Sequence, residues 1–473
     1  MEKIKYFILT VATVILTSCA TQKYTAPEGV VRNNSSFRNA EFDTTNNFAK
    51  INWNEFYSDP FLIALIDSAI NNNLDLKIAE SSIRAAQESY KQAQAAFFPS
   101  LGVSAGVGVS GRNIGGTLQS VWSYSMLMES TVQTTAVAAT WEIDVWGKLA
   151  SVERSQRAAL EQTELYYKAV ITELVAAVAS AYYQLLVYDE QLRIYETSAQ
   201  TRKQSLEVVE AMKEAAFTNE VAVNQSAAQY LNVMASIPQT KNSIQNTENL
   251  IATLIGIEPQ EIKRSTFRES LFVEEIDMLK VGVPAQLLAN RPDIMAVEQG
   301  LIRAHEYWNY TRAAMYPSFV ISGNAGFNTT QFNNWFSYPE SFIGNLIGGV
   351  TQPIFAQRKL KTQKNIAEEQ KLQAIYSYKN SILLAQKEVA NALAFYQFSK
   401  ESIVYQEQLV EHLNSAVSGS SELFKNGFVS YLDLLYAEDN ALSSSIGLLQ
   451  TQFQNARAKI ELYRALGGGW NKN

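Results

Sequence analysis

The sequence predicts a mainly helical protein with a small β part, in which a long α-helical barrel continues into a transmembrane β-barrel shared by several chains. Three observations predict this fold class. The chain repeats itself once, residues 148–215 and 358–426 keep an unbroken helical periodicity, and four short segments alternate apolar with small or polar side chains. Each long helix would extend about 100 Å at about 1.5 Å per residue, which no ordinary globular domain houses.

Composition excludes several classes of protein. Of the 473 residues, 47% are hydrophobic and 18% are charged, so the chain has enough apolar surface to fold. After the N-terminus no apolar run is long enough for a multipass helical membrane protein. The net charge of −7 is spread over mixed charges, which argues against nucleic acid as a partner. Two histidines and one cysteine cannot build a zinc cluster or an intrachain disulfide framework.

The N-terminus has the pattern of an export signal. Lys3 and Lys5 precede a short apolar run, which ends just before the lone cysteine, Cys19. This boundary resembles the bacterial lipoprotein cleavage motif, which implies removal of residues 1–18 and acylation of Cys19. The alternative is an incidental thiol in an ordinary signal peptide. Residues 19–52, rich in Asn, Thr and Ser, are expected to form a tether.

An internal repeat divides the rest of the chain. Asp75 and Asp293 are 218 positions apart, whereas Thr140 and Thr351 are 211 apart, so the first copy carries seven extra residues between its strands. Each copy has the order helix, strand pair, long helix, turn, helix. The expected boundaries are a first repeat at 53–256, a linker at 257–288, a second repeat at 289–467 and a tail at 468–473.

The individual elements follow from local patterns. Asp59 and Pro60 are expected to begin the first helix as cap and first residue, and Pro99 to end it. The four strands are predicted from apolar residues at every second position. These apolar residues are Leu101, Val103, Ala105, Val107 and Val109; Val137, Ala139, Trp141 and Ile143; Phe319, Ile321, Ala325 and Phe327; and Leu346, Val350 and Ile354.

Four strands cannot close a membrane barrel, and open sheet edges are not tolerated in hydrocarbon. Two chains would give eight strands with a filled interior, whereas three chains give twelve strands and an open pore. The sequence therefore predicts a homotrimer whose barrel is in contact with membrane lipid. Trp141 and Trp146, near strand ends, are expected to lie at the membrane interface.

The helical turns also have recognisable signals. Gly427 is placed to end the second long helix in a left-handed conformation. Ser430 and Asp433 then form an S-x-x-D start for the next helix. The equivalent turn of the first copy is expected near residues 216–219.

The chain resembles the TolC-like outer membrane efflux proteins, in the lipoprotein (NodT-type) branch. The segments that carry the resemblance are Leu288-Ala289-Asn290-Arg291-Pro292-Asp293-Ile294, Asp144-Val145-Trp146-Gly147-Lys148, Thr351-Gln352-Pro353-Ile354-Phe355 and Gly427-Phe428-Val429-Ser430-Tyr431-Leu432-Asp433. The resemblance implies a lipid-anchored trimer in the outer membrane that extends into the periplasm. It implies a passive exit duct, with no enzyme activity and no cofactor besides the lipid on Cys19. The implied partners are a periplasmic adaptor (membrane fusion) protein and an inner-membrane RND pump.

The same resemblance suggests where such a duct closes. Asp433, Tyr436 and Asp439 recur at a spacing of three, so they can share one face of a helix. They are gate candidates: rings of Asp433 or Asp439 would favour cations, and Tyr436 would narrow the passage. The alternative is that Asp433 only caps the helix and Asp439 is a solvated charge.

Some patterns imitate enzyme motifs. Gly102–Gly106 fits a nucleophile elbow and Gly106–Gly111 a dinucleotide fingerprint, but both fall in a predicted strand, without the strand-to-helix turn that they require. His305 and His412 have no ligand cluster and are expected to pack or to be solvated.

Two other functions use related architectures. One is an exit duct for polypeptides in type I secretion; the other, less favoured, is a surface lipoprotein scaffold without a pore.

Overall fold

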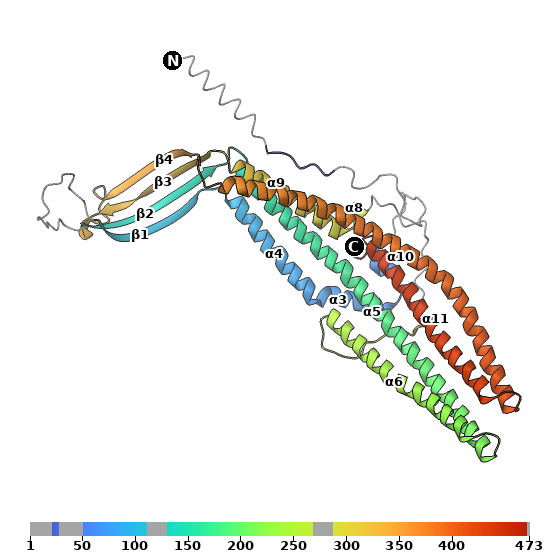
Figure 1. The fold of residues 1–473 in the computed structure, drawn as a ribbon. Helices are drawn as coiled ribbons and strands as arrows, with labels where there is room; N and C mark the ends of the chain where they lie inside the picture. The colour runs from blue at the N-terminus through green and yellow to red at the C-terminus, as the bar shows by residue number, and fades with distance from the viewer. Residues whose placement is uncertain (1–20, 28–50, 111–129, 268–286, 471–473) are drawn as a thin grey trace, which may run out of the picture. The chain divides into compact units, whose positions relative to one another are not determined.

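The computed structural model describes residues 21–27, 51–110, 130–267 and 287–470 (Figure 1). These residues form two compact units, and each is described by itself. The first unit contains residues 84–161 and 298–376 together with 21–27, and the second contains the remaining described residues.

The first unit contains a four-stranded antiparallel sheet in the order β1-β2-β3-β4 (Figure 1). Sequence neighbours pair throughout, so β1 and β4 are the two edges. The strands are β1 (Ser100–Ser110), β2 (Ser130–Ile143), β3 (Ser318–Thr329) and β4 (Phe342–Thr351). A 3-10 turn, η4 (Phe332–Asn334), lies between β3 and β4.

The register separates the two faces of this sheet. Val103 lies opposite Val137, Val137 opposite Ala325, and Ala325 opposite Gly344, so these positions share one face. That face is apolar and includes Leu101, Val107, Trp141, Ile143, Phe319, Ile321, Phe327, Leu346 and Val350. The other face is mostly small or polar, with Ser104, Thr140, Ser322, Asn324 and Asn345, apart from Val320, Ile343 and Ile347. One apolar and one polar face suit a wall between lipid and an aqueous lumen.

The repeat in the sequence is a repeat in the structure. The long helices α5 (Lys148–Glu214) and α10 (Lys359–Lys425) have 67 residues each. The helices that follow them, α6 (Glu220–Leu254) and α11 (Tyr431–Ala465), have 35 residues each. The two predicted long helices and the predicted turns after them are therefore confirmed.

Two details of the prediction are wrong. The first helix is not continuous: α3 (Pro60–Asn72) and α4 (Leu74–Ala95) are separated at Asn73. The Asn73 side chain accepts a hydrogen bond from Leu76 N–H at 3.1 Å and donates one to the Leu254 carbonyl at 2.8 Å, so it caps one helix while binding the end of α6. Ile354 was expected in the last strand, but β4 ends at Thr351.

The remaining helices are short or interrupted. α2 (Trp53–Phe56) precedes α3, whose cap Asp59 accepts from Phe61 N–H at 2.9 Å as predicted. In the second copy, α8 (Leu287–Asn290) precedes α9 (Pro292–Ala313), which leads to β3.

One window of α5 is apolar enough to cross a membrane, but 67% of it is buried within the protein. Fully buried side chains from this helix include Tyr182, Leu185 and Leu186. Burial against other helices explains this apolar window, so α5 is a core helix.

Candidate functional site

The turn between α10 and α11 forms as the sequence predicts. Gly427 has φ +76°, the left-handed conformation that favours glycine. Its N–H donates to the Phe424 carbonyl at 2.9 Å, and the Phe428 N–H donates to the Leu423 carbonyl at 2.9 Å. This pair of bonds satisfies carbonyls at the end of α10 and turns the chain back.

The first copy makes the same turn without glycine. Ala216 has φ 64°, and the Phe217 N–H donates to the Met212 carbonyl at 2.8 Å. Asn219 then caps α6 by accepting from Ala222 N–H at 3.1 Å. Phe217 and Phe428, equivalent residues at the two tips, both have exposed rings.

Asp433 forms the predicted capping box at the start of α11. Its Oδ2 accepts from Ser430 N–H at 3.0 Å and from the Ser430 hydroxyl at 2.7 Å. These hydrogen bonds, the side-chain one foremost, lower the pKa of the exposed Asp433 carboxyl. Asp433 is therefore held at the end of its own helix.

Asp439 joins α11 to α5. Its Oδ1 lies 2.5 Å from Nη2 of Arg202, whose side chain is only 3% exposed, whereas that of Asp439 is 40% exposed. Nη1 of Arg202 also donates to Gln229 of α6 at 2.8 Å. One guanidinium thus connects three helices, and Asp439 is an ion-pair partner rather than a solvated charge.

Glu438, next to Asp439, makes a second polar contact between the same helices. The Ser205 hydroxyl donates to its Oε1 at 3.0 Å. Burial, more than the neighbouring Asp439, raises the pKa of Glu438, while Ser205 and Arg202 act in the opposite direction. Within the described part of the chain, Oε2 of Glu438 and Nε of Arg202 are buried without a hydrogen-bond partner. Both side chains line a cavity of about 300 Å³ between α5, α10 and α11.

An apolar cluster holds the helices together between this contact and the tips. It is made of Val209 on α5, Phe424 on α10, and Tyr431, Leu434 and Leu435 on α11. Tyr436 lies outside this cluster with its ring exposed. Of the three gate candidates, Asp439 therefore contacts α5, Asp433 contacts its own cap, and Tyr436 points away from the core.

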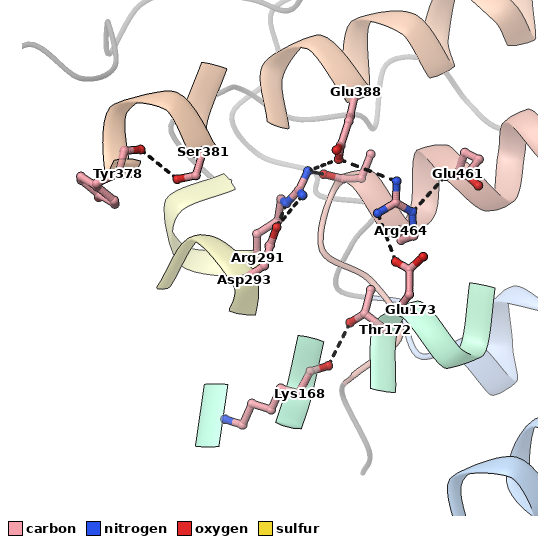
Figure 2. A network of polar contacts seen from close by, with 11 residues as sticks. Lys168, Thr172, Glu173, Arg291, Asp293, Tyr378, Ser381, Glu388, Glu461 and Arg464 are labelled. Atoms are coloured by element: carbon pink, nitrogen blue, oxygen red, sulfur yellow. Dashed lines mark hydrogen bonds and ion pairs between the residues drawn. The ribbon is translucent and has the colours of Figure 1, made fainter. Parts of the chain in front are cut away.

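A separate polar network surrounds the Arg291-Pro292-Asp293 segment (Figure 2). Arg291 binds Asp293 at 3.0 and 2.6 Å, Glu388 of α10 at 2.8 Å and the Ala465 carbonyl of α11 at 3.1 Å. Burial opposes ionisation of Asp293, but the Arg291 guanidinium prevails and lowers the pKa of this carboxyl. Arg464 extends the network to Glu461 at 2.9 Å. The segment that carries the family resemblance is thus a junction of helices.

The predicted interface aromatics lie where strands meet helices. Trp141 is on the apolar face of β2 and its indole N–H donates to the Phe97 carbonyl at 2.8 Å. Trp146 follows β2, donates to the Pro317 carbonyl at 2.6 Å and stacks on Tyr316. Cys19, the predicted acylation site, lies outside the described residues.

His305 is buried, which agrees with packing, one of the two roles expected for it. Its Nε2 lies 2.9 Å from the Gln22 carbonyl. His412 is exposed on α10. Residues 102–106 lie within β1, so the elbow-like pattern belongs to a strand, whereas Gly111 of the fingerprint-like pattern lies outside the described residues.

Arg202, Ser205, Gln229 and Glu438 were not predicted as site residues. Arg202 and Ser205 lie toward the C-terminal end of a long helix with charges throughout, where nothing local distinguishes them. Only the structure shows that they meet α11.

Comparisons with known proteins agree with this architecture. The chain matches the model of the outer membrane efflux protein family over residues 65–257 and 283–468. It is 27% identical to the cation efflux system protein CusC of Escherichia coli O6:H1, with 92% of each chain covered. It is 26% identical to the probable outer membrane lipoprotein SilC of Salmonella typhimurium, covering 99% of this chain and 100% of SilC. A crystal structure of CusC superposes with a TM-score of 0.81 at 26% identity, covering 95% of this chain and 99% of that one.

The expected fold class, mainly helical with four antiparallel strands in two repeats, is therefore confirmed, as is the location in the outer membrane. This is a family of channels rather than enzymes. The chain belongs to the outer membrane efflux protein family and is the outer-membrane channel of an efflux system.

Proposed function

We propose that the protein is the exit duct of a tripartite efflux pump, in which a periplasmic adaptor and an inner-membrane RND pump deliver small toxic molecules, such as drugs. The names of its relatives support this role: CusC is a cation efflux system protein, and another relative, SrpC of Pseudomonas putida, is a solvent efflux pump outer membrane protein. The names of CusC and SrpC refer to efflux of cations and of solvents, which favours efflux over polypeptide secretion.

The duct is a homotrimer in this proposal. The four-stranded sheet has free edges at β1 and β4, and neither edge can remain unpaired in hydrocarbon. Pairing β4 of one chain with β1 of the next closes the barrel, and three chains supply twelve strands.

The adaptor binds the helical tips in this proposal. Phe217 and Phe428 expose their rings at equivalent turns of the two copies. Exposed aromatic rings are enriched where proteins bind each other. A trimer would present six such tips.

The observation that carries the gating part of the proposal is the pair of polar contacts between α5 and α11. The two contacts use consecutive residues of α11 and the same partner helix, α5: Arg202 binds Asp439, and Ser205 binds Glu438. Opening the end of the helical barrel requires α11 to move from α5, which breaks both contacts. Because Arg202 neutralises Asp439, the exposed Asp433 and Tyr436 remain to face the passage.

The lipid on Cys19 also belongs to this proposal, with the lipoprotein SilC as support. The division of the chain into a signal peptide, a tether, two repeats and a linker is also part of this proposal.

The test is deletion of the gene, followed by measurement of susceptibility to a panel of drugs, detergents and metal ions. We expect sensitivity to at least one class, restored by the wild-type gene. Unchanged susceptibility together with loss of a secreted polypeptide would instead favour the secretion duct.

A further inference from the structure

The segment that joins β4 to α10 has an unusual composition. Ile354 and Phe355 are 97% and 86% exposed, the highest values among the large apolar side chains of the described residues. Four cations follow within ten residues: Arg358, Lys359, Lys361 and Lys364. No acidic residue occurs between 352 and 364. We call residues 352–364 the basic segment.

The basic segment lies at one end of the sheet. Val350, two residues before it, is on the apolar face of β4, opposite Phe319. The β3–β4 connection is at the other end of these strands, so the basic segment is at the end where the helices begin (Figure 1). The basic segment therefore continues from the lipid-facing surface of the sheet toward the periplasm.

The four cations do not stabilise the N-terminal end of α10. Lys359 is the first residue of α10, and its first turn contains no acid. Positive charges at a helix N-terminus oppose the helix dipole and destabilise the helix. Among the described residues, none of the four side chains forms an ion pair.

The first copy provides an internal comparison. At the repeat offset of 211, Lys148 corresponds to Lys359, Ala150 to Lys361 and Glu153 to Lys364. There the one equivalent cation has a partner, since Lys148 pairs with Glu142, and Glu153 places an acid where the second copy has Lys364. The same place in the fold is thus neutralised in one copy and left positive in the other.

We propose that the basic segment is a binding surface for anionic phospholipid headgroups in the periplasmic leaflet of the outer membrane. Ile354 and Phe355 enter the boundary between headgroups and acyl chains, and the four cations bind the phosphates. Apolar anchors next to clustered cations are the combination that binds an anionic membrane surface. Continuity with the lipid-facing strands selects lipid, rather than a soluble anion, as the occupant.

The experiment uses the purified full-length oligomer in detergent, with phosphatidylglycerol or phosphatidylcholine added in mixed micelles. Retained lipid is counted by native mass spectrometry, and the thermal midpoint is recorded. The test variant carries Arg358→Gln, Lys359→Gln, Lys361→Gln and Lys364→Gln. The control variant removes the same charge at four exposed lysines elsewhere, through Lys203→Gln, Lys379→Gln, Lys387→Gln and Lys425→Gln.

Wild type and control should retain more phosphatidylglycerol than phosphatidylcholine. In the test variant the ratio of the two retained lipids should fall at least about tenfold, because each cation near an anionic surface raises lipid affinity by about a factor of five. Equal retention by test and control variants overturns the proposal. So does stabilisation by inorganic phosphate alone, which would indicate a soluble-anion site, or dissociation into monomers, which would indicate an interface between chains. If the fourfold variant does not fold, Arg358→Gln with Lys361→Gln should give a partial loss. The test is independent of the gate, because it measures no conduction.

Discussion

Arg202 and Asp439 are 237 residues apart in sequence and 2.5 Å apart in the structure, where they connect α5 to α11. Arg202 is buried and Asp439 is partly exposed, so loss of the aspartate leaves a buried guanidinium with only Gln229 as a polar side-chain partner among the described residues. Under the gating proposal, this imbalance makes the pair a sensitive point for opening the channel.

We expect Asp439→Asn to weaken the α5–α11 contact by about 1–3 kcal/mol, because a buried charge loses its partner. Open events in single-channel recordings should become more frequent. Arg193→Gln is the matched control, since Arg193 is 58% exposed, pairs with Glu190 on the same helix, and its loss should change the free energy of unfolding by less than about 1 kcal/mol. Equal opening in both variants would show that the pair does not hold the channel closed.

Glu438 gives a pH dependence whose sign follows from its raised pKa. Its contribution to stability is fully present below the unfolded-state pKa of about 4.3 and is lost as the pH rises through the raised folded-state value. Glu438→Gln keeps the Ser205 contact without the buried charge. The variant should match wild type near pH 4 and have a higher thermal midpoint, by a few degrees, near pH 7.

The exposed Glu422→Gln is the control for this effect and should follow the wild-type pH profile. If Glu438→Gln also follows that profile from pH 4 to 8, burial of Glu438 has no energetic consequence.

The two tips allow a reciprocal test of backbone strain. Gly427→Ala places a side chain at φ +76° and should destabilise the tip by about 1–2 kcal/mol, whereas Ala216→Gly at φ 64° should stabilise it by a similar amount. Apart from Gly427 and its two chain neighbours, no heavy atom of the described residues lies within 4 Å of the position that a Cβ at Gly427 would take, so the effect is of the backbone alone. Amide hydrogen exchange at the two turns measures it, and changes of the same sign in both variants would refute the explanation.

Intact mass of the protein purified from membranes tests the acylation of Cys19. We expect a chain that begins at Cys19 and carries lipid, and a Cys19→Ser variant without lipid that is delivered to the outer membrane less efficiently. A wild-type chain that retains Ser18, or an unmodified Cys19, would disprove the prediction.

Local signals were sufficient to predict much of this structure. Gly427, Ser430 and Asp433 act within one turn of chain, so their cap and turn could be derived from spacing alone. Equal offsets between the copies predicted two long helices of the same length.

Long-range contacts could not be predicted in this way. The break at Asn73 depends on the Leu254 carbonyl, 181 residues away, and the partner of Asp439 lies in a different copy of the repeat. Asp433 and Asp439 have the same spacing from Tyr436 in sequence, yet only one of them contacts α5. Which carboxylate meets a partner is decided by helix packing, which spacing does not contain.

Conductance of the purified full-length protein in a planar lipid bilayer tests the central claim most directly. Wild type should form a pore with a low open probability, and Asp439→Asn should open it more often while remaining the same oligomer by native mass spectrometry. Absence of any conductance from both proteins, with the oligomer and its β-structure intact, would contradict the assignment of the chain as a channel closed by the α5–α11 contact.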